Sequence, residues 1–237
     1  MKRTYLYLIF LLPLLLLAPY VQASLYQLPA GKTEIGFTFS AADNTTNTRT
    51  IAADFDYGID NHLKMSFQAG LGFDDSEAYQ APLEVPPYPV GGISMTRIDA
   101  LGQTGLDYFL VGIFGASFSR TVFPTGSETF FGILDSSNDG TFYRRRVLGL
   151  SGGGGILKRL NTQSEWTLKP FLGLYYANSW TVIEFDETSV EQFSSTGSIL
   201  GEVGLEIEMS PRTSVTGSLA FSFESSQTAF TIGINFH

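Results

Sequence analysis

Strict alternation of apolar and polar residues is the feature of this sequence that most restricts its fold. It is clearest in residues 228–237. The apolar positions there are Phe230, Ile232, Ile234 and Phe236, and the positions between them are Thr231, Gly233 and Asn235. Because successive side chains of a strand point to opposite faces, this pattern predicts a strand with one apolar and one polar face. Residues 215–224 alternate in the same way, and the short polar link 225–227 predicts a hairpin.

The end of this last strand resembles a known family. An alternating strand tipped by an aromatic residue, here Phe236, resembles the C-terminal closing strand of bacterial outer-membrane β-barrels. The resemblance implies that the last strand pairs with the first and that the barrel-assembly machinery of the outer membrane recognises it. The family's usual last residue is Phe, whereas this chain adds His237.

The first residues have the composition of a secretory signal peptide. Lys2 and Arg3 precede an apolar run at 5–17, and Val21-Gln22-Ala23 follows it. We expect a signal peptide at 1–23, cleaved after Ala23, and a barrel domain at 24–237. The alternative is a transmembrane helix, but the run is shorter than the roughly 20 residues needed to span a bilayer and contains Pro13.

The composition of the chain excludes several classes of function. The net charge is −9 and becomes more negative once Lys2 and Arg3 are removed, which argues against nucleic acid as a partner. There is no Cys, so a disulfide, a thiolate nucleophile and a Cys-based metal site are all impossible. No segment after the leader is apolar enough for a membrane helix, so any spanning must be done by strands. We expect no cofactor and no metal.

Alternation continues through the rest of the chain and predicts about ten strands. They are residues 35–41, 50–59, 62–73, two strands within 96–121, 142–157, 166–183, 198–209, 215–224 and 228–237. Eight strands remain an alternative if one weak segment is a loop. We place the turn within 96–121 near residues 108–110, with 102–105 as the alternative. Long links at 74–94, 123–140 and 186–194 alternate with short ones, as in barrels with short periplasmic turns and longer outer loops.

Three features predict that the apolar face points outward, into lipid. The polar face is mostly Gly, Ser and Thr, which suit a crowded lumen better than a water-exposed wall. The strands match or exceed the roughly 9–11 residues that cross a bilayer at a tilt. Aromatic residues near strand ends predict an interfacial girdle of Tyr57, Tyr108, Trp166, Trp180 and Phe236. The sequence therefore predicts an all-β, transmembrane, antiparallel up-and-down barrel; the alternative is a soluble barrel whose apolar face points inward.

Within the strand at 166–183, Trp166 and Trp180 lie on the same face. At the usual rise and tilt of a strand they are about 35 Å apart along the membrane normal, enough to bracket an apolar band of about 25 Å. Pro170 cannot donate to the strand ladder, so we expect a bulge beside it.

Charged residues on the opposite face are expected to line the lumen. They are Glu34, Asp54, Asp56, Lys64, Arg97, Asp99, Asp107, Lys169, Glu202, Glu206 and Glu208. A ten-stranded barrel is only somewhat wider than its side chains can fill, so these charges must pair or stay hydrated. One interpretation is a salt-bridge network that plugs the barrel, and the other is a narrow, cation-preferring pore.

Two further motifs were weighed for binding. Arg144 and Arg146 lie on one face at the expected outer rim, where they are candidates for contact with lipopolysaccharide phosphates; solvated rim charge is the equal alternative. The glycines at 152–155 lack the Lys-Ser or Lys-Thr of a phosphate loop, so we interpret them as permitting sharp coiling or close packing.

We therefore expect a non-enzymatic outer-membrane protein that acts through its outer loops or passes small solutes. The only histidines, His62 and His237, are placed on the periplasmic side, so a catalytic constellation cannot be assembled at the outer rim. The alternatives are an outer-membrane surface enzyme that cleaves protein or modifies lipid, and a soluble ligand-binding barrel. Expected partners are outer-membrane lipid, lipopolysaccharide and the barrel-assembly machinery. The sequence does not define the solute, the loop partner or the oligomeric state.

Overall fold

The computed structural model of the chain describes residues 25, 27–43, 48–74, 86–122, 142–162, 166–185, 190–224 and 227–237. Its strands are β1 (Thr33–Asp43), β2 (Arg49–Gly58), β3 (Leu63–Phe73), β4 (Tyr88–Ala100), β5 (Leu106–Val122), β6 (Phe142–Lys158), β7 (Leu160–Asn161), β8 (Thr167–Phe185), β9 (Val190–Ser210), β10 (Thr213–Ser222) and β11 (Thr228–Phe236). Within the described ranges no helix has the length and hydropathy needed to cross a membrane.

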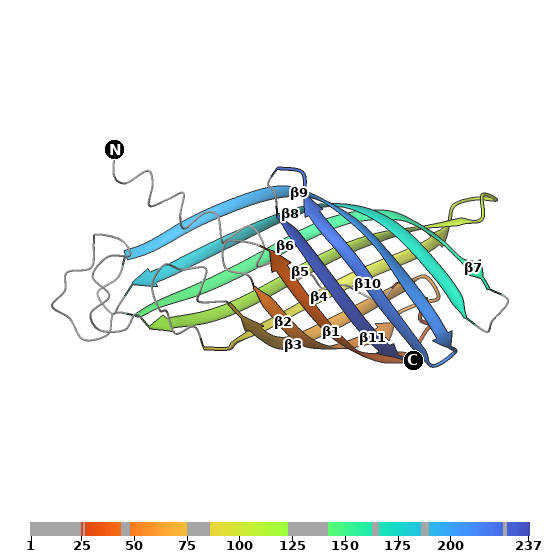
Figure 1. Cartoon of the computed structure of the whole chain (residues 1–237), viewed down its shortest axis with the longest axis horizontal. Coiled ribbons are helices and arrows are strands. Elements are labelled where there is room, and N and C mark those ends of the chain that lie inside the picture. Colours follow the sequence, from red (N-terminus) through yellow and green to blue (C-terminus); the bar gives the residue numbers. More distant parts are fainter. Residues whose placement is uncertain are drawn as a thin grey trace.

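The strands form one closed sheet in which each pairs antiparallel with its neighbours in sequence (Figure 1). The sheet closes between the first and last strands, with Ile35 opposite Phe236 and Ala41 opposite Phe230. On the far side β6 pairs with β8, and the two-residue β7 continues along the same side of β8. The predicted fold, an all-β up-and-down barrel, is confirmed with ten long strands rather than eight.

The two ends of the barrel differ in their connections. We call the end that carries the turns at 59–62, 101–105 and 211–212 the turn end, and the opposite end, which carries the links at 74–87 and 123–141, the loop end. The C-terminus lies at the turn end (Figure 1). The turn expected at 108–110 is wrong: β4 and β5 are joined at 101–105. Gly102 and Gly105 adopt φ of 59° and 71° there, a conformation that residues 108–110, which contain no glycine, do not favour.

Other expected boundaries also move. β4 already begins at Tyr88 and β9 at Val190, within segments expected to be loops. No bulge lies beside Pro170, whose register with β9 is continuous. On its other side β8 pairs with β6 as far as Leu157 and with β7 from Leu160, in the same register. Pro170 lies opposite the short gap between these two pairings, where its missing N–H is not needed. A register shift occurs elsewhere, between β9 and β10 at Thr213.

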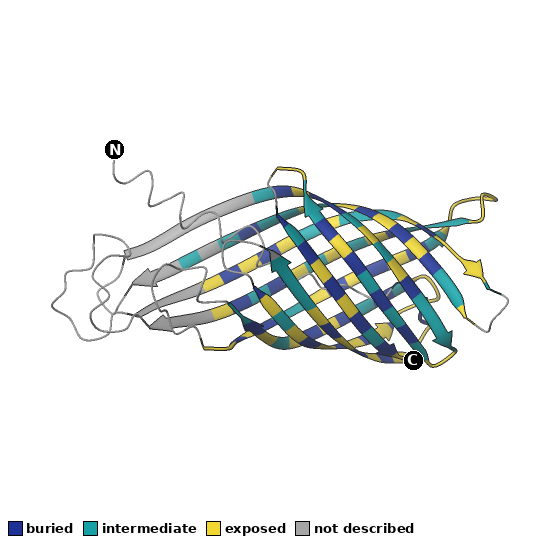
Figure 2. Ribbon diagram, in the orientation of Figure 1, coloured by how far each residue is buried: buried dark blue, intermediate teal, exposed yellow. Residues whose placement is uncertain are grey.

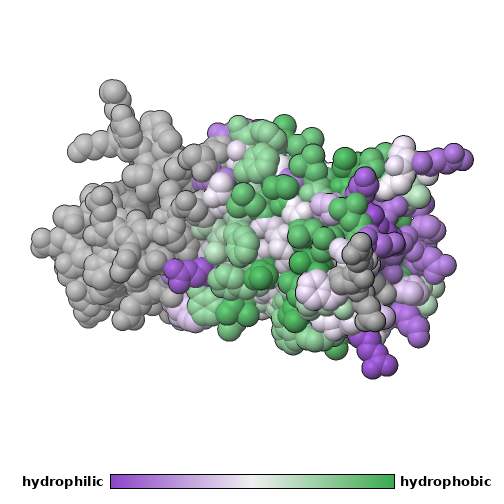
Figure 3. Space-filling model, turned by 45° about the vertical axis from the view of Figure 1, so that its right-hand side comes forward, coloured by the Kyte–Doolittle hydropathy of each residue, from purple (hydrophilic) through white to green (hydrophobic). Residues whose placement is uncertain are grey.

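Alternation places the apolar side chains on the outside of the barrel. In β2 and β11 exposed side chains alternate with buried ones, and Figure 2 shows the resulting stripes. Side chains that are about half exposed include Phe37, Ile51, Leu110, Leu150, Leu172, Leu174 and Tyr176. They form an apolar band with hydrophilic residues beyond it at one end (Figure 3). A contiguous apolar surface of this kind requires a lipid environment, so a soluble barrel with an inward apolar face does not fit.

Four consecutive strands are longer than the rest. β5 and β6 have 17 residues each, β8 has 19 and β9 has 21, whereas β10 and β11 have 10 and 9. Together β5, β6, β8 and β9 extend past the other strands at the loop end (Figure 1). We call the parts of these four strands on the loop-end side of Phe118, Arg146, Val182 and Phe193 the extended wall. These residues form one row across the sheet, in which each pairs with its neighbour on the next strand.

The outward face of β8 provides a test of lipid contact. Replacing the 56% exposed Leu174 with Arg should lower the free energy of unfolding by about 2–4 kcal/mol, because the charge enters the middle of the apolar band. The control is Leu160→Arg, the same change on an exposed residue at the turn end, where a cost of about 0–1 kcal/mol is expected. Equilibrium unfolding in lipid vesicles measures both, and equal costs would contradict lipid contact at Leu174.

Candidate functional site: the charged interior

The interior of β2 and β3 holds an ion pair. Alternation turns Asp56 and Lys64 inward from adjacent strands, and the Lys64 ammonium donates to Asp56 Oδ2 at 2.8 Å. Their side chains are 4% and 3% exposed. A pair so completely removed from water must satisfy its charges within the protein.

A second interior group joins β8 and β9. Lys169 lies directly opposite Glu206 in the ladder, and its ammonium donates to Glu206 Oε1 at 2.9 Å. The same ammonium also forms an ion pair with Glu208, two residues further along β9. The side chains of Lys169 and Glu206 are 1% and 0% exposed. One lysine is therefore shared by two carboxylates in the interior.

A third interior pair lies where the barrel closes. The imidazole of His237, through Nδ1, is 2.7 Å from Glu34 Oε2, and the two side chains are 4% and 1% exposed. The alternation predicts that Glu34 points inward, but it indicates no interior role for His237. The signal was present in the expected pairing of the last strand with the first, because Ile35 faces Phe236 and so brings the neighbouring residues together.

The remaining interior carboxylates are held by neutral donors. Asp54 accepts hydrogen bonds from the Thr38 hydroxyl at 2.5 Å and from the Gln68 amide at 2.8 Å. Glu202 is hydrogen-bonded by Ser218 and Tyr175. Across the lumen, Glu34 and Glu206 both act electrostatically on Lys64. The pairs on different strands are thus close enough to form one charged cluster.

Another part of the interior, near the turn end of β4, β5, β6 and β8, holds an apolar cluster. Ile98, Phe109, Leu157 and Phe171 form a buried cluster with Leu25, and Tyr175 packs against it. The rings of Phe109 and Phe171 meet edge to face at 6.3 Å. Glycines make room for them: a Cβ on Gly155 would lie 2.6 Å from Phe109 and one on Gly204 would lie 2.2 Å from Phe171. The interpretation of the glycine run as allowing close internal packing fits this arrangement.

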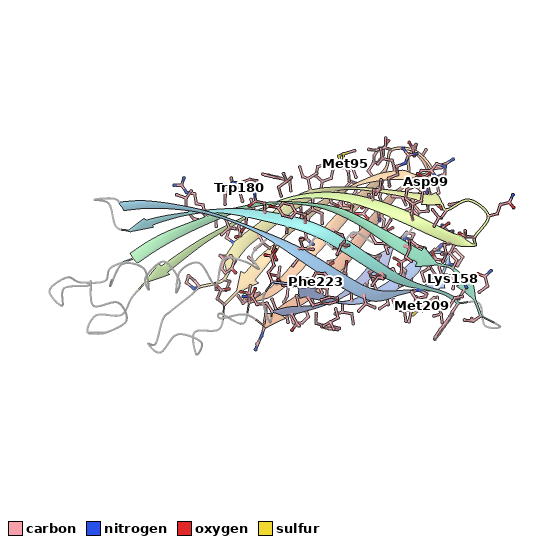
Figure 4. The ribbon with its side chains drawn as sticks, turned by 90° about the horizontal axis from the view of Figure 1, so that it is seen from above. Met95, Asp99, Lys158, Trp180, Met209 and Phe223 are labelled. Carbon is pink, nitrogen blue, oxygen red and sulfur yellow. The ribbon has the colours of Figure 1, made fainter. Side chains whose placement is uncertain are left out.

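Two residues expected inside lie outside. Arg97 and Asp99 follow the outward parity of Met95, while Ile98 between them is buried. Arg97 and Asp99 therefore face outward, as the alternation of β4 requires. They lie beyond the apolar band because this part of β4 is close to the turn end, where Figure 4 shows Asp99. Asp99 pairs there with Arg97 at 2.5 Å and with His62 at 2.9 Å.

The other predicted positions are distributed as follows. Asp107 turns inward at the turn end, where it pairs with Arg159 at 2.8 Å. In the turn at 59–62, backbone N–H groups of His62 and Leu63 hold the pKa of the exposed Asp60 below its usual value. Arg146 is exposed on the outer face; the side chain of Arg144 lies outside the described residues.

The predicted girdle residues are divided between the two ends. Tyr57, Tyr108, Trp166 and Phe236 lie at the turn end, where the Tyr108 hydroxyl donates to Asp99 Oδ2 at 3.1 Å. Trp180 lies toward the loop end (Figure 4). Trp166 and Trp180 share the outward face of β8 as expected, with half-exposed Leu172 and Leu174 between them.

Among the described residues, no group of three or more His, Cys, Asp or Glu side chains is arranged to hold a metal ion. The interior carboxylates are instead directed at lysines, hydroxyls and amides.

Comparison with solved structures identifies the fold. The translocator domain of the autotransporter NalP from Neisseria meningitidis is similar with a TM-score of 0.55 at 8% identity, and the match covers 86% of each chain. The outer-membrane protease OmpT from Escherichia coli has a TM-score of 0.44 at 9% identity, covering 87% of this chain and 93% of that one. Ail, the attachment invasion locus protein of Yersinia pestis, has a TM-score of 0.37 at 12% identity, covering 86% and 95%.

No protein-family model matches the sequence, and a search of curated proteins finds no match. At 8% identity, the similarity to the NalP translocator domain, a bacterial outer-membrane β-barrel, supports the fold alone. The fold of this chain is therefore that of the bacterial outer-membrane β-barrels, as the closing strand suggested.

The lysine shared by two glutamates should be essential for stability. Lys169→Met should lower the free energy of unfolding by about 3–5 kcal/mol, because it leaves Glu206 and Glu208 without their buried counterion. Arg159→Met is the control, since it breaks a pair whose arginine is 43% exposed and should cost about 1 kcal/mol or less. Denaturant titration of both variants in the same vesicles decides the point; similar small losses would mean that the interior pair is hydrated.

Proposed function

We propose that this chain is a non-enzymatic outer-membrane protein whose lumen is closed to solutes and whose extended wall presents a binding surface outside the cell. The turn end then faces the periplasm and the loop end the exterior, the usual arrangement of short turns and long loops in such barrels. A signal peptide at 1–23 would direct the chain to that membrane, and β11 would serve as the strand that the barrel-assembly machinery recognises.

The observation that carries this proposal is the filled interior. The two lysine-centred groups have side chains that are at most 4% exposed, apart from Glu208 at 22%. A conducting filter must bind ions weakly enough to release them and must keep a continuous path of water. Carboxylates bound to lysines in a dry interior provide neither, so of the two interpretations of the interior charges we favour the plug.

The extended wall supports the binding role. In β9, residues 190–198 pair with β8 on one side, while β10 reaches only to Leu200. In β5, residues 118–122 pair with β6 but not with β4, whose pairing ends at Ser117. Within the described residues the wall therefore has two open backbone edges. An open edge presents unpaired N–H and C=O groups, with which an extended segment of another protein can pair as a further strand.

The positions of the histidines support a role without catalysis. His62 lies in a turn-end link and His237 follows β11 at the same end, so both are remote from the extended wall. Arg146 stands on the outer face at the foot of the wall and is our candidate, with Arg144, for contact with lipopolysaccharide phosphates.

A planar bilayer experiment tests the closed lumen. We expect no stepwise conductance from the purified, folded protein, because the interior ion pairs leave no continuous water path. Cation-selective steps that disappear in the Glu202→Gln and Glu206→Gln variants would overturn the proposal in favour of a pore lined by these carboxylates.

Shortening the extended wall tests the binding role. Residues 119–145 and 183–192 can each be replaced by a short Gly-Ser turn, because the flanking residues face one another along one rung of the ladder. We expect this variant to fold and to remain non-conducting. Cells that display it should lose most of the attachment shown by the full-length protein to protein-coated and cell surfaces. Unchanged attachment of the shortened variant, or none by the full-length protein, would contradict the role.

A further inference from the structure

The segment before β1 lies inside the barrel. Leu25 and Leu28 are 6% and 3% exposed, whereas the residues that follow them, Pro29 and Ala30, are exposed. From Leu25 the chain therefore runs from the interior toward the turn end before β1 begins at Thr33. A segment that merely extended into the periplasm would leave both leucines in water.

Leu25 is held by two unlike contacts. Its side chain completes the apolar cluster with Ile98, Phe109, Leu157 and Phe171. Its backbone N–H donates to Glu206 Oε2 at 2.8 Å, while the other oxygen of that carboxylate accepts from Lys169. Glu206 thus joins the segment directly to the charged cluster, and both of its oxygens are used.

The rest of the segment is fastened at the turn end. The Gln27 amide donates to the Ile98 carbonyl at 3.3 Å and accepts from Arg159 at 2.6 Å. The Ala30 N–H donates to the Asn61 side chain at 3.3 Å. Gly58 lets the segment lie against β2, since a Cβ there would come within 2.2 Å of the Pro29 carbonyl. Four separate parts of the barrel therefore contact these few residues.

Removal of the leader would create a positively charged α-ammonium group at the start of this segment. If the leader is removed after Ala23, the new α-ammonium group belongs to Ser24, whose nitrogen is separated from the Leu25 nitrogen by only two atoms. That places a cation within a few ångströms of Glu206. The interior has carboxylates in excess of lysines, since Lys169 serves both Glu206 and Glu208, so a further cation there is favoured.

We propose that the turn end of the lumen is a binding site for the chain's own processed amino terminus, with Glu206 as the anchoring carboxylate. The docked segment closes the periplasmic mouth beneath the ion-pair cluster. The proposal goes beyond the closed lumen: it can fail while the barrel remains non-conducting.

Single cysteines test the docked position. The chain contains no Cys, so Leu28→Cys and Ala30→Cys each introduce a unique thiol. In the folded protein we expect a maleimide to react at position 28 at least about tenfold more slowly than at position 30, and equally fast at both after denaturation. Equal rates in the folded protein would overturn the proposal.

The anchoring role of Glu206 is tested by acylation of the amino terminus near neutral pH, followed by mass spectrometry. We expect an amino terminus at Ser24 that reacts about tenfold more slowly in the folded than in the denatured protein. Glu206→Gln should remove most of this protection, whereas Glu224→Gln, which changes an exposed carboxylate, should not. Gel migration shows whether each variant is folded. An amine that reacts equally fast in the folded and denatured protein, or a folded Glu206→Gln variant with full protection, would overturn the anchor.

Discussion

Closure of the sheet between β1 and β11 is the constraint on which the rest of this structure depends. A sheet in hydrocarbon cannot leave a backbone edge unpaired, because each unpaired amide or carbonyl costs several kcal/mol there. The nine paired positions from Ile35–Phe236 to Asp43–Thr228 remove that edge along β1 and β11. Closure with ten strands also makes the interior narrow, so inward charges cannot be separated by bulk water and must find partners among themselves.

The narrow interior is divided into two sides of different chemistry. Thr38, Asp56, Lys64 and Glu206 of the polar side lie on β1, β2, β3 and β9, and Lys169 reaches them from β8. Ile98, Phe109, Leu157 and Phe171 of the apolar side lie on β4, β5, β6 and β8. Leu25 contacts both sides, because its side chain packs in the apolar cluster and its N–H donates to Glu206 on the polar side. An interior that was polar all round would offer no reason for an apolar side chain to enter it.

The sequence predicted which face of each strand is outward wherever one face was apolar and the other polar, since a period of two needs no knowledge of neighbouring strands. It was least informative in β4 and β5, where both faces carry apolar residues. There the position of the turn, and the faces of Arg97 and Asp99, were wrong. Parity counted from Met95 would have placed both charges outside, but the expectation that charge belongs in the lumen overrode it.

Contacts between strands were the other limit of the sequence. The partnership of His237 with Glu34, and that of Leu25 with Glu206, join residues about two hundred positions apart, and each depends on a register that alternation alone does not define. Pro170 shows the same limit. Its missing donor was foreseen, but whether the chain would bulge or leave a gap in the ladder depended on the neighbouring strand.

Buried ion pairs are a weak source of stability, because desolvation offsets much of their attraction. Their positions suggest a different contribution here. Lys169 faces Glu206 directly across the β8–β9 ladder, and a slip of one residue would turn one of the two charges outward into lipid. Lys169 lies near the turn end, where a lysine turned into lipid costs only about 0–1 kcal/mol, so the larger penalty of a slip comes from the partner left uncompensated inside. The interior charges thus oppose incorrect registers more strongly than they stabilise the correct one. This gives the lumen that we propose to be closed a reason to keep its charges instead of being filled with leucine.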